Sequence, residues 1–230
     1  MDRGLVAFGD VHLQWQSMRV ILDHAREHGI DTALTLGDEG YTFGPSAPSD
    51  YELMWNELRT YRDEKAGREL ICCIGDHTSY PAKDLLPHFV GAKESATRGK
   101  KAVVYQDGSV LAAHNGQWIL DLHRGKIEGY GGLEPLVIFH GHSHSLGVLP
   151  DYRWLRDDEL VYWLRAGEEQ HSLEPGKVYW VNPGSQIQRV DDGRMAANFA
   201  LYNPKERLVT LRTILYNDDD ISPSRARHRR

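Results

Sequence analysis

Short apolar runs recur along the first third of the chain, and each one stops at a Gly-Asp pair. The runs are Leu5–Phe8, Thr32–Leu36 and Glu69–Ile74, and the pairs begin at Gly9, Gly37 and Gly75. Runs of this length that are bounded by glycine predict buried β-strands. The sequence therefore predicts three strands that each end in a carboxylate.

Segments with helical spacing of apolar residues lie between these strands. The first predicted helix has Ser17 as its N-cap and ends near Gly29, and the second runs from Asp50 to about Ala66. Strands that alternate with helices are typical of a parallel sheet with right-handed crossover connections. This half of the chain therefore predicts an α/β domain.

The pattern changes after residue 100, where short strands follow one another without intervening helices. We expect strands at Ala102–Tyr105, Val110–His114, Trp118–Leu122, Leu136–Phe139 and Lys177–Val181, and a closing hairpin of Ala197–Tyr202 with Leu208–Leu215. Asn115-Gly116 is a strong type I′ hairpin signal. We expect one domain over residues 1–216, with an inserted segment at about 145–174. Residues 217–230 lack apolar periodicity and are expected to be a disordered tail.

Composition limits the class of protein. The 230 residues carry a formal charge of −6, which argues against a protein that binds nucleic acid through a basic face. Two adjacent cysteines, Cys72 and Cys73, are expected to be reduced core residues on opposite faces of a strand. We find no signal peptide and no apolar span of about twenty residues, so we expect a cytoplasmic protein without a membrane partner.

Polar groups that can bind a cation follow five of the predicted strands. They are Asp10 with His12, Asp38, Asp76 with His77, His123, and His142 with His144. Ligands bind outside the carboxyl ends of strands in open α/β sheets, so we expect these side chains to meet. Three carboxylates in one crevice repel one another unless cations neutralise them, which favours a two-metal site. For the His142–His144 pair alone, exposed loop histidines are the alternative.

These residues resemble the motifs of the calcineurin-like metallophosphoesterase family. The family pattern D-x-H, GD, GNH, H and GHxH matches, in order, segments that begin at Asp10, Gly37, Gly75, His123 and Gly141. Asn182-Pro183-Gly184-Ser185 also matches a segment of the small bacterial phosphodiesterases. The resemblance implies two packed mixed β-sheets flanked by helices, a four-layer αββα sandwich.

The resemblance also implies a ligand set and a reaction. Two divalent ions (Mn, Fe, Zn or Ni) are then held by two sets that share Asp38: Asp10, His12, Asp38 and His144, and Asp38, Asp76, His123 and His142. A hydroxide that bridges the two ions attacks the phosphorus of a phosphodiester or phosphomonoester, while His77 assists the leaving oxygen. The expected substrate is a small phosphoester of about nucleotide size.

Two positions leave alternatives open. His114 competes with His123 as the middle histidine, and we favour His123 because His114 precedes the Asn-Gly turn, at the far end of a hairpin strand. The family usually has glycine after this histidine, whereas Arg124 stands here. Arg124 is either a substrate-phosphate contact or a surface residue.

The remaining departures concern Asp76 and Thr78. The family has asparagine where Asp76 stands, and an acidic residue often occupies the position of Thr78. Asp76 adds a negative charge that would tighten the second metal and favour a singly charged diester. The alternative is a weakened site on a protein that serves as a binding scaffold. His24, His28, His88 and His171 lack the ligand spacing and are expected on the surface.

Overall fold

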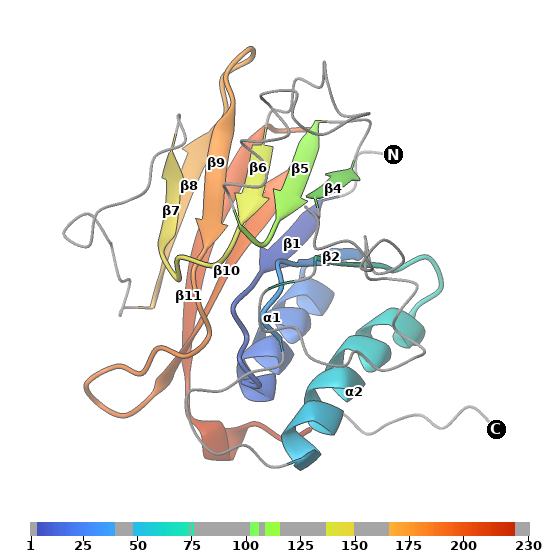
Figure 1. Ribbon diagram of the computed structural model, residues 1–230, viewed down its shortest axis with the longest axis vertical. Coiled ribbons are helices and arrows are strands. Elements are labelled where there is room, and N and C mark those ends of the chain that lie inside the picture. Colours follow the sequence, from blue (N-terminus) through green and yellow to red (C-terminus); the bar gives the residue numbers. More distant parts are fainter. Residues whose placement is uncertain are drawn as a thin grey trace.

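Two mixed β-sheets lie face to face, and two helices cover the outer face of one of them (Figure 1). The structure is a computed structural model that describes residues 4–39, 48–73, 75, 102–105, 109–115, 137–149 and 166–223. The predicted fold class of two packed sheets with helices is therefore confirmed. Helices lie on only one side of the stack in these described ranges.

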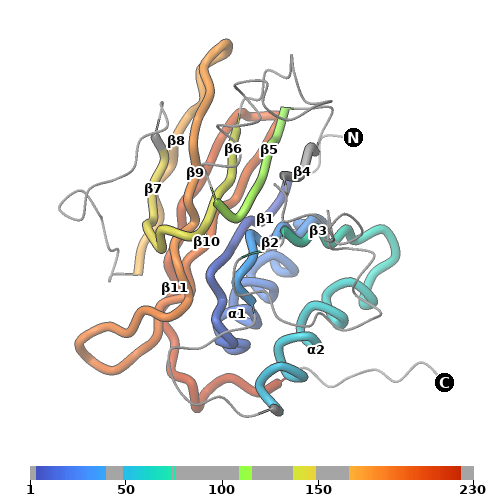
Figure 2. Tube along the Cα trace, viewed as in Figure 1, coloured from blue at the N-terminus to red at the C-terminus, as the bar shows by residue number. Residues whose placement is uncertain are grey.

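The six-stranded sheet has the order β3-β2-β1-β10-β11-β8. Its first three strands are parallel, as the strand and helix pattern predicts, and β10 with β11 forms the predicted antiparallel hairpin. Figure 2 shows β1 and β10, from opposite ends of the chain, side by side at the middle of this sheet. The strands are β1 (Leu5–Phe8), β2 (Thr32–Thr35), β3 (Glu69–Cys72), β8 (Gly167–Ser172), β10 (Met195–Asn203) and β11 (Leu208–Tyr216).

The five-stranded sheet has the order β4-β5-β6-β9-β7. The central strands β5, β6 and β9 are parallel, and the edge strands β4 and β7 are antiparallel to their neighbours. The predicted strand Trp118–Leu122 lies outside the described residues. The strands of this sheet are β4 (Ala102–Tyr105), β5 (Val110–Ala113), β6 (Val137–His140), β7 (Leu146–Leu149) and β9 (Tyr179–Pro183).

The segment predicted as an insertion, residues 145–174, contributes a strand to each sheet. Strand β7 pairs with β9 in the five-stranded sheet, and β8 pairs with β11 at the edge of the six-stranded sheet. Near the C-terminus, the first residues of the predicted tail form a short 3₁₀ helix, η5 (Asp218–Asp220), and residues 224–230 lie outside the described part.

Both predicted helices are present, α1 (Trp15–Glu27) and α2 (Pro48–Glu64). The prediction that Ser17 caps the first helix is wrong, because the helix begins two residues earlier. Ser17 is instead buried inside α1, with its hydroxyl 2.6 Å from that of Tyr216. In the described part of the chain, no helix combines the length and the apolar character needed to cross a membrane.

The core has two layers, one on each face of the six-stranded sheet, and every residue of its central strand β1 is buried. Val6 and Phe8 face the helices, whereas Leu5 and Ala7 face the second sheet, as the alternation of side chains along a strand requires. The two cysteines follow the same rule. Cys72 packs in the helix layer and Cys73 between the sheets, and both are buried free thiols, which confirms their predicted role.

Asn198 is the buried polar residue that ties β10 to the segment after β9. Its side-chain amide donates to the carbonyl of Ser185 and to Gln188 Oε1, each at 2.9 Å. Its side-chain oxygen accepts from the hydroxyl of Thr213 at 2.7 Å. Since Asn198 has no exposed surface, water cannot replace these partners.

We predict that Asn198→Ala lowers the free energy of unfolding by about 2–4 kcal/mol, because buried donors and acceptors lose their partner. Urea titration followed by circular dichroism measures the change. Gln170→Ala is the matched control on the exposed edge strand β8, and it should change the free energy by less than about 0.5 kcal/mol. Equal effects of the two substitutions would contradict the structural role of Asn198.

Candidate metal centre

Loops at the carboxyl ends of strands from both sheets meet in one place. Asp10 and His12 follow β1, Asp38 follows β2, His114 follows β5, and the pair His142 and His144 follows β6. Backbone hydrogen bonds join neighbouring loops: Asp10 N donates to Gly37 O at 3.1 Å, His12 N to Asp38 O at 2.8 Å, and Gly141 N to His114 O at 3.0 Å. The fold thus brings together side chains that are up to 134 positions apart in the printed sequence.

Most of these residues have a left-handed backbone. The described residues other than glycine include seven with a positive φ, and five of them carry a candidate ligand: Asp10, His12, Asp38, His142 and His144, with φ between 47° and 69°. Asp and His tolerate this region better than most residues, but each such position is strained by about 1–3 kcal/mol. Strained positions of this kind cluster at functional sites.

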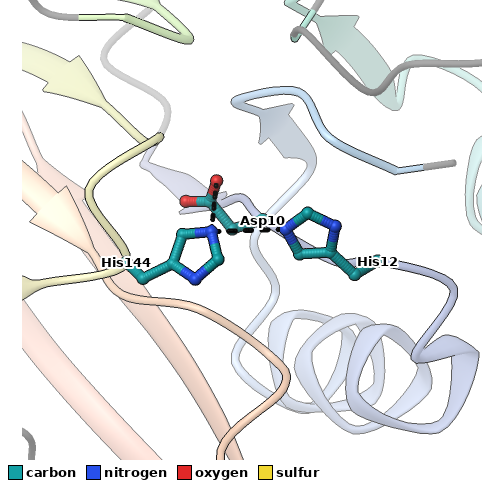
Figure 3. Close-up of side chains that lie close together, drawn as sticks. All are labelled: Asp10, His12 and His144. Atoms are coloured by element: carbon teal, nitrogen blue, oxygen red, sulfur yellow. Dashed lines mark hydrogen bonds and ion pairs between the residues drawn. The ribbon is translucent and has the colours of Figure 1, made fainter. Parts of the chain in front are cut away.

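The first cluster consists of Asp10, His12 and His144, whose ligand atoms all lie within 4.8 Å of one another (Figure 3). His144 Nε2 lies 3.6 Å from Asp10 Oδ1 and 3.3 Å from His12 Nε2. His12 Nε2 is also 4.0 Å from Asp38 Oδ2, so Asp38 borders this cluster. Two ring nitrogens that face each other beside carboxylates are arranged as ligands around a shared cation.

The second cluster consists of Asp10, Asp38 and His114. His114 Nε2 lies 3.3 Å from Asp38 Oδ2 and 3.2 Å from His142 Nδ1. On the other side of its ring, His114 Nδ1 lies 2.8 Å from the carbonyl of Leu36. A carbonyl only accepts, so Nδ1 carries a proton and Nε2 faces the cluster, where it donates to Asp38 while it is protonated and can bind a cation once it is deprotonated. A metal-ligating histidine is held in this way.

Burial and neighbouring charged groups together set the charge states of the site in the absence of a cation. Burial raises the pKa of Asp10 to about 7, although the backbone N–H of His142 and the charge of His114 oppose the shift. Burial also lowers the pKa of His144 to about 4, and His12 adds to this effect. For His114, burial lowers the pKa, but the hydrogen bond to Asp38 and the nearby carboxylates outweigh it and raise the pKa to about 9.

The donor set suits divalent cations. Asp10 and Asp38 are almost completely buried, and His12 and His114 are equally inaccessible to water. Two neighbouring carboxylates that are buried in this way need positive charge nearby to ionise fully, and a divalent cation supplies it. Mn, Fe, Zn and Ni all bind oxygen and nitrogen donors, so the donor set leaves the identity of the metal open.

The placement of His114 corrects one premise of the sequence analysis. His114 was expected at the far end of a hairpin strand, but β5 runs parallel to β6, and its carboxyl end therefore lies beside Gly141. His114 is therefore a site histidine of the described residues, although the hairpin signal favours His123 over it. An apolar run that ends in histidine, Val110–His114, was the signal for it. His123 lies outside the described residues, and its assignment stays a prediction.

In all, four predicted site residues lie outside the described residues: Asp76, His77, His123 and Arg124. Gly75, which precedes Asp76, is described and packs directly on Asp38. A Cβ on Gly75 would collide with the backbone and carboxylate of Asp38, and a Cβ on Gly37 would lie 2.5 Å from Gly75 N. Only glycine fits where the loops after β2 and β3 approach so closely.

Asn182 supports the loop that carries His142 and His144. Its side-chain amide donates to the hydroxyl of Ser143 at 2.8 Å, and its side-chain oxygen accepts from Gly184 N at 3.0 Å. The hydroxyl of Ser185 donates to the carbonyl of Asp10 at 3.3 Å. The Asn-Pro-Gly-Ser segment therefore links the loop after β6 to the loop after β1.

No protein-family model and no curated protein matches this sequence. Among solved structures, a metallophosphoesterase from Sphaerobacter thermophilus is similar, with a TM-score of 0.51 and 17% identity over 96% of this chain and 91% of that chain. An archaeal phosphodiesterase has a TM-score of 0.50 and 13% identity over 93% of this chain and 99% of that chain. The chain therefore has the fold of these proteins, as the motif resemblance implied.

We predict that His114→Ala weakens Mn²⁺ binding by about tenfold or more, since even residues that only orient a ligand change affinity by about 10–100-fold. Isothermal titration calorimetry on the metal-free protein measures it. His171→Ala on β8 is the matched control and should bind Mn²⁺ like the unsubstituted protein. If His123→Ala loses the affinity and His114→Ala retains it, His123 is the ligand and our reading of His114 is wrong.

Proposed function

We propose that the protein is a metal-dependent phosphoesterase that hydrolyses a small phosphodiester. The observation that carries the proposal is the cluster of two buried carboxylates, Asp10 and Asp38, with two buried histidines, His12 and His114, and the more exposed His142 and His144, at the carboxyl ends of strands from both sheets. The fold shared with a metallophosphoesterase and a phosphodiesterase supports the same reaction class. Fold alone does not define function, so the chemistry of the site is the stronger support.

The residues divide into two overlapping sets. Asp10, His12, Asp38 and His144 would hold one cation, and Asp38, Asp76 and His142 would hold the other together with His123 or His114. When bound, the two divalent cations supply Lewis acidity and lower the pKa of a water molecule that becomes the nucleophile. The chain's own contribution is to keep Asp38 between both sets and to exclude bulk water from it.

His77 is proposed to donate a proton to the leaving oxygen, as the motif resemblance implies. The chain charge of −6 disfavours a long nucleic acid, so the proposed substrate is a single phosphoester of nucleotide size. Arg124 is proposed as a contact to its phosphate. These assignments concern residues outside the described part of the chain.

The first test is hydrolysis of bis-p-nitrophenyl phosphate. We expect no turnover after chelation of metal and recovery of turnover when Mn²⁺ is returned. Release of p-nitrophenolate, measured by absorbance, reports the rate. Bound metal without turnover on any phosphoester would favour the alternative that the protein is a binding scaffold.

Two substitutions separate metal binding from proton donation in the same assay. Asp38→Asn should lose both turnover and Mn²⁺ affinity, because both proposed sets contain Asp38. His77→Gln should bind Mn²⁺ normally and lower kcat by about 10²–10⁴-fold, the range for loss of a general acid. Normal kcat in His77→Gln would exclude His77 from the reaction.

The charge of Asp76 supports a diester rather than a monoester as substrate. Asp10, Asp38 and Asp76 contribute −3 against +4 from two divalent ions, which leaves +1, whereas asparagine at position 76 would leave +2. A monoester dianion gains more from the extra positive charge than a diester monoanion does. The aspartate at this position therefore favours the singly charged substrate.

We predict that Asp76→Asn raises monoesterase activity relative to diesterase activity by about tenfold, equivalent to about 1.4 kcal/mol of differential stabilisation. The ratio of kcat/KM for bis-p-nitrophenyl phosphate and p-nitrophenyl phosphate measures it. Asp76→Glu keeps the charge and is the matched control. An unchanged ratio in Asp76→Asn would show that net charge does not select the substrate.

A further inference from the structure

A second group of potential metal ligands lies at the C-terminal end of α1, in its last turn and at the residue that follows it, apart from the strand ends. His24, Glu27 and His28 each offer a ligand atom, and these atoms all lie within 4.8 Å of one another. Residues three and four positions apart share one face of a helix, so the spacing itself brings them together. Trp15, the first residue of α1, follows the loop that carries Asp10 and His12, and roughly 14 Å of helix axis separates it from His24.

The sequence analysis expects His24 on the surface and without ligand spacing, and both expectations are wrong, because His24 is buried and its ligand atom lies near those of Glu27 and His28. His24 is only 5% exposed, because it extends the apolar face of α1 and its ring packs 5.1 Å from that of Phe199 on β10. Its Nε2 is buried and has no hydrogen-bond partner among the residues that the structure describes. Buried polar atoms are almost always satisfied, so an orphaned imidazole nitrogen beside two other ligands requires an explanation.

His28 is already oriented as a ligand. Its ring lies against that of His24, with 3.9 Å between centroids, and its Nδ1 is 2.9 Å from the carbonyl of His24. The carbonyl accepts, so Nδ1 carries the proton and the lone pair is on Nε2. A backbone carbonyl commonly fixes the tautomer of a metal-binding histidine in this way.

The pKa of His24 and the exposure of Glu27 and His28 also bear on whether the group can bind a cation. Burial lowers the pKa of His24 to about 4, with smaller contributions from His28 and Arg212. Glu27 and His28 are exposed, so a cation can reach them from solvent. The nearby charges of Glu168 and Arg212 pair with each other at 2.8 Å and offset one another.

We propose that His24, Glu27 and His28 form a second, independent site for a late first-row divalent cation such as Zn²⁺ or Co²⁺. Two histidines one helical turn apart are a known zinc-binding arrangement, and two imidazoles with one carboxylate form a common zinc ligand set. Water completes the coordination. Ligand atoms of a tetrahedral site lie roughly 3.4 Å apart for bonds of about 2.1 Å, so the exposed His28 and Glu27 move inward on binding.

The consequence for the protein is structural. A cation held by all three residues fixes the last turn of α1, where the helix ends at Glu27, and holds that turn on Phe199 of the six-stranded sheet. The site shares no residue with the strand-end clusters. Its existence therefore does not depend on the proposed phosphoesterase activity.

Titration of the metal-free, full-length protein with Co²⁺ alone tests the proposal. We expect His28→Ala to bind one Co²⁺ fewer at saturation than the unsubstituted protein, or to bind that ion about tenfold or more weakly. His171→Ala, on the edge strand β8, is the matched control and should retain the full stoichiometry. Equilibrium dialysis with elemental analysis counts the ions, and His28 is exposed, so the substitution leaves the core intact.

A second readout locates the ion. Substoichiometric Co²⁺ is expected to broaden the imidazole NMR signals of both His24 and His28. Identical stoichiometry and affinity in the unsubstituted protein and His28→Ala would overturn the proposal. Unchanged His24 and His28 signals on Co²⁺ addition would overturn it as well. Hydrolysis of bis-p-nitrophenyl phosphate is measured in parallel, so failure of this site is distinguished from failure of the proposed activity.

Discussion

The burial of two neighbouring carboxylates, Asp10 and Asp38, is the constraint on which the rest of the structure depends. Both are almost fully inaccessible to water, and each has an atom within 4.8 Å of the other. A single buried charge without a partner is strongly unfavourable, and two like charges add repulsion. The loops around them therefore supply compensation. Both oxygens of Asp10 lie 3.1 Å from the backbone N–H of His142, and His114 approaches Asp38.

Backbone strain at the site is a second unfavourable contribution, in addition to the burial of the two carboxylates. Five candidate ligands have left-handed backbones, and at about 1–3 kcal/mol each their sum approaches the 5–15 kcal/mol net stability of a typical domain. Such a geometry persists only where the surroundings over-determine it. Here the loops after β1 and β2 are held together by hydrogen bonds from Asp10 N, His12 N and Leu13 N. The close approach of Gly37 to Gly75 leaves that pair of loops little freedom.

The sequence predicts the parts of the site that follow from local patterns. Asp10, Asp38, His142 and His144 each follow an apolar run, and the carboxyl ends of parallel strands meet at one edge whatever the length of chain between them. Local patterns do not show which distant strands pair, and the predicted position of His114 was wrong for this reason. The Asn-Gly signal suggested that His114 lies at the far end of a hairpin, whereas its strand pairs in parallel with β6. Similarly, no local signal shows that Ser17 bonds to Tyr216 across 199 positions.

The site joins the two sheets, and this makes its assembly inseparable from that of the fold. Asp10 follows a strand of the six-stranded sheet, yet its carboxylate accepts from the backbone N–H of His142, which follows a strand of the five-stranded sheet. Its carbonyl likewise accepts from Gln186 N at 3.2 Å and from Ser185, both after β9. Since these contacts form only when both sheets are in place, the ligand set does not pre-exist in the unfolded chain. Any cation that prefers this set therefore stabilises the packing of one sheet on the other, by the same linkage that couples ligand binding to folding in general.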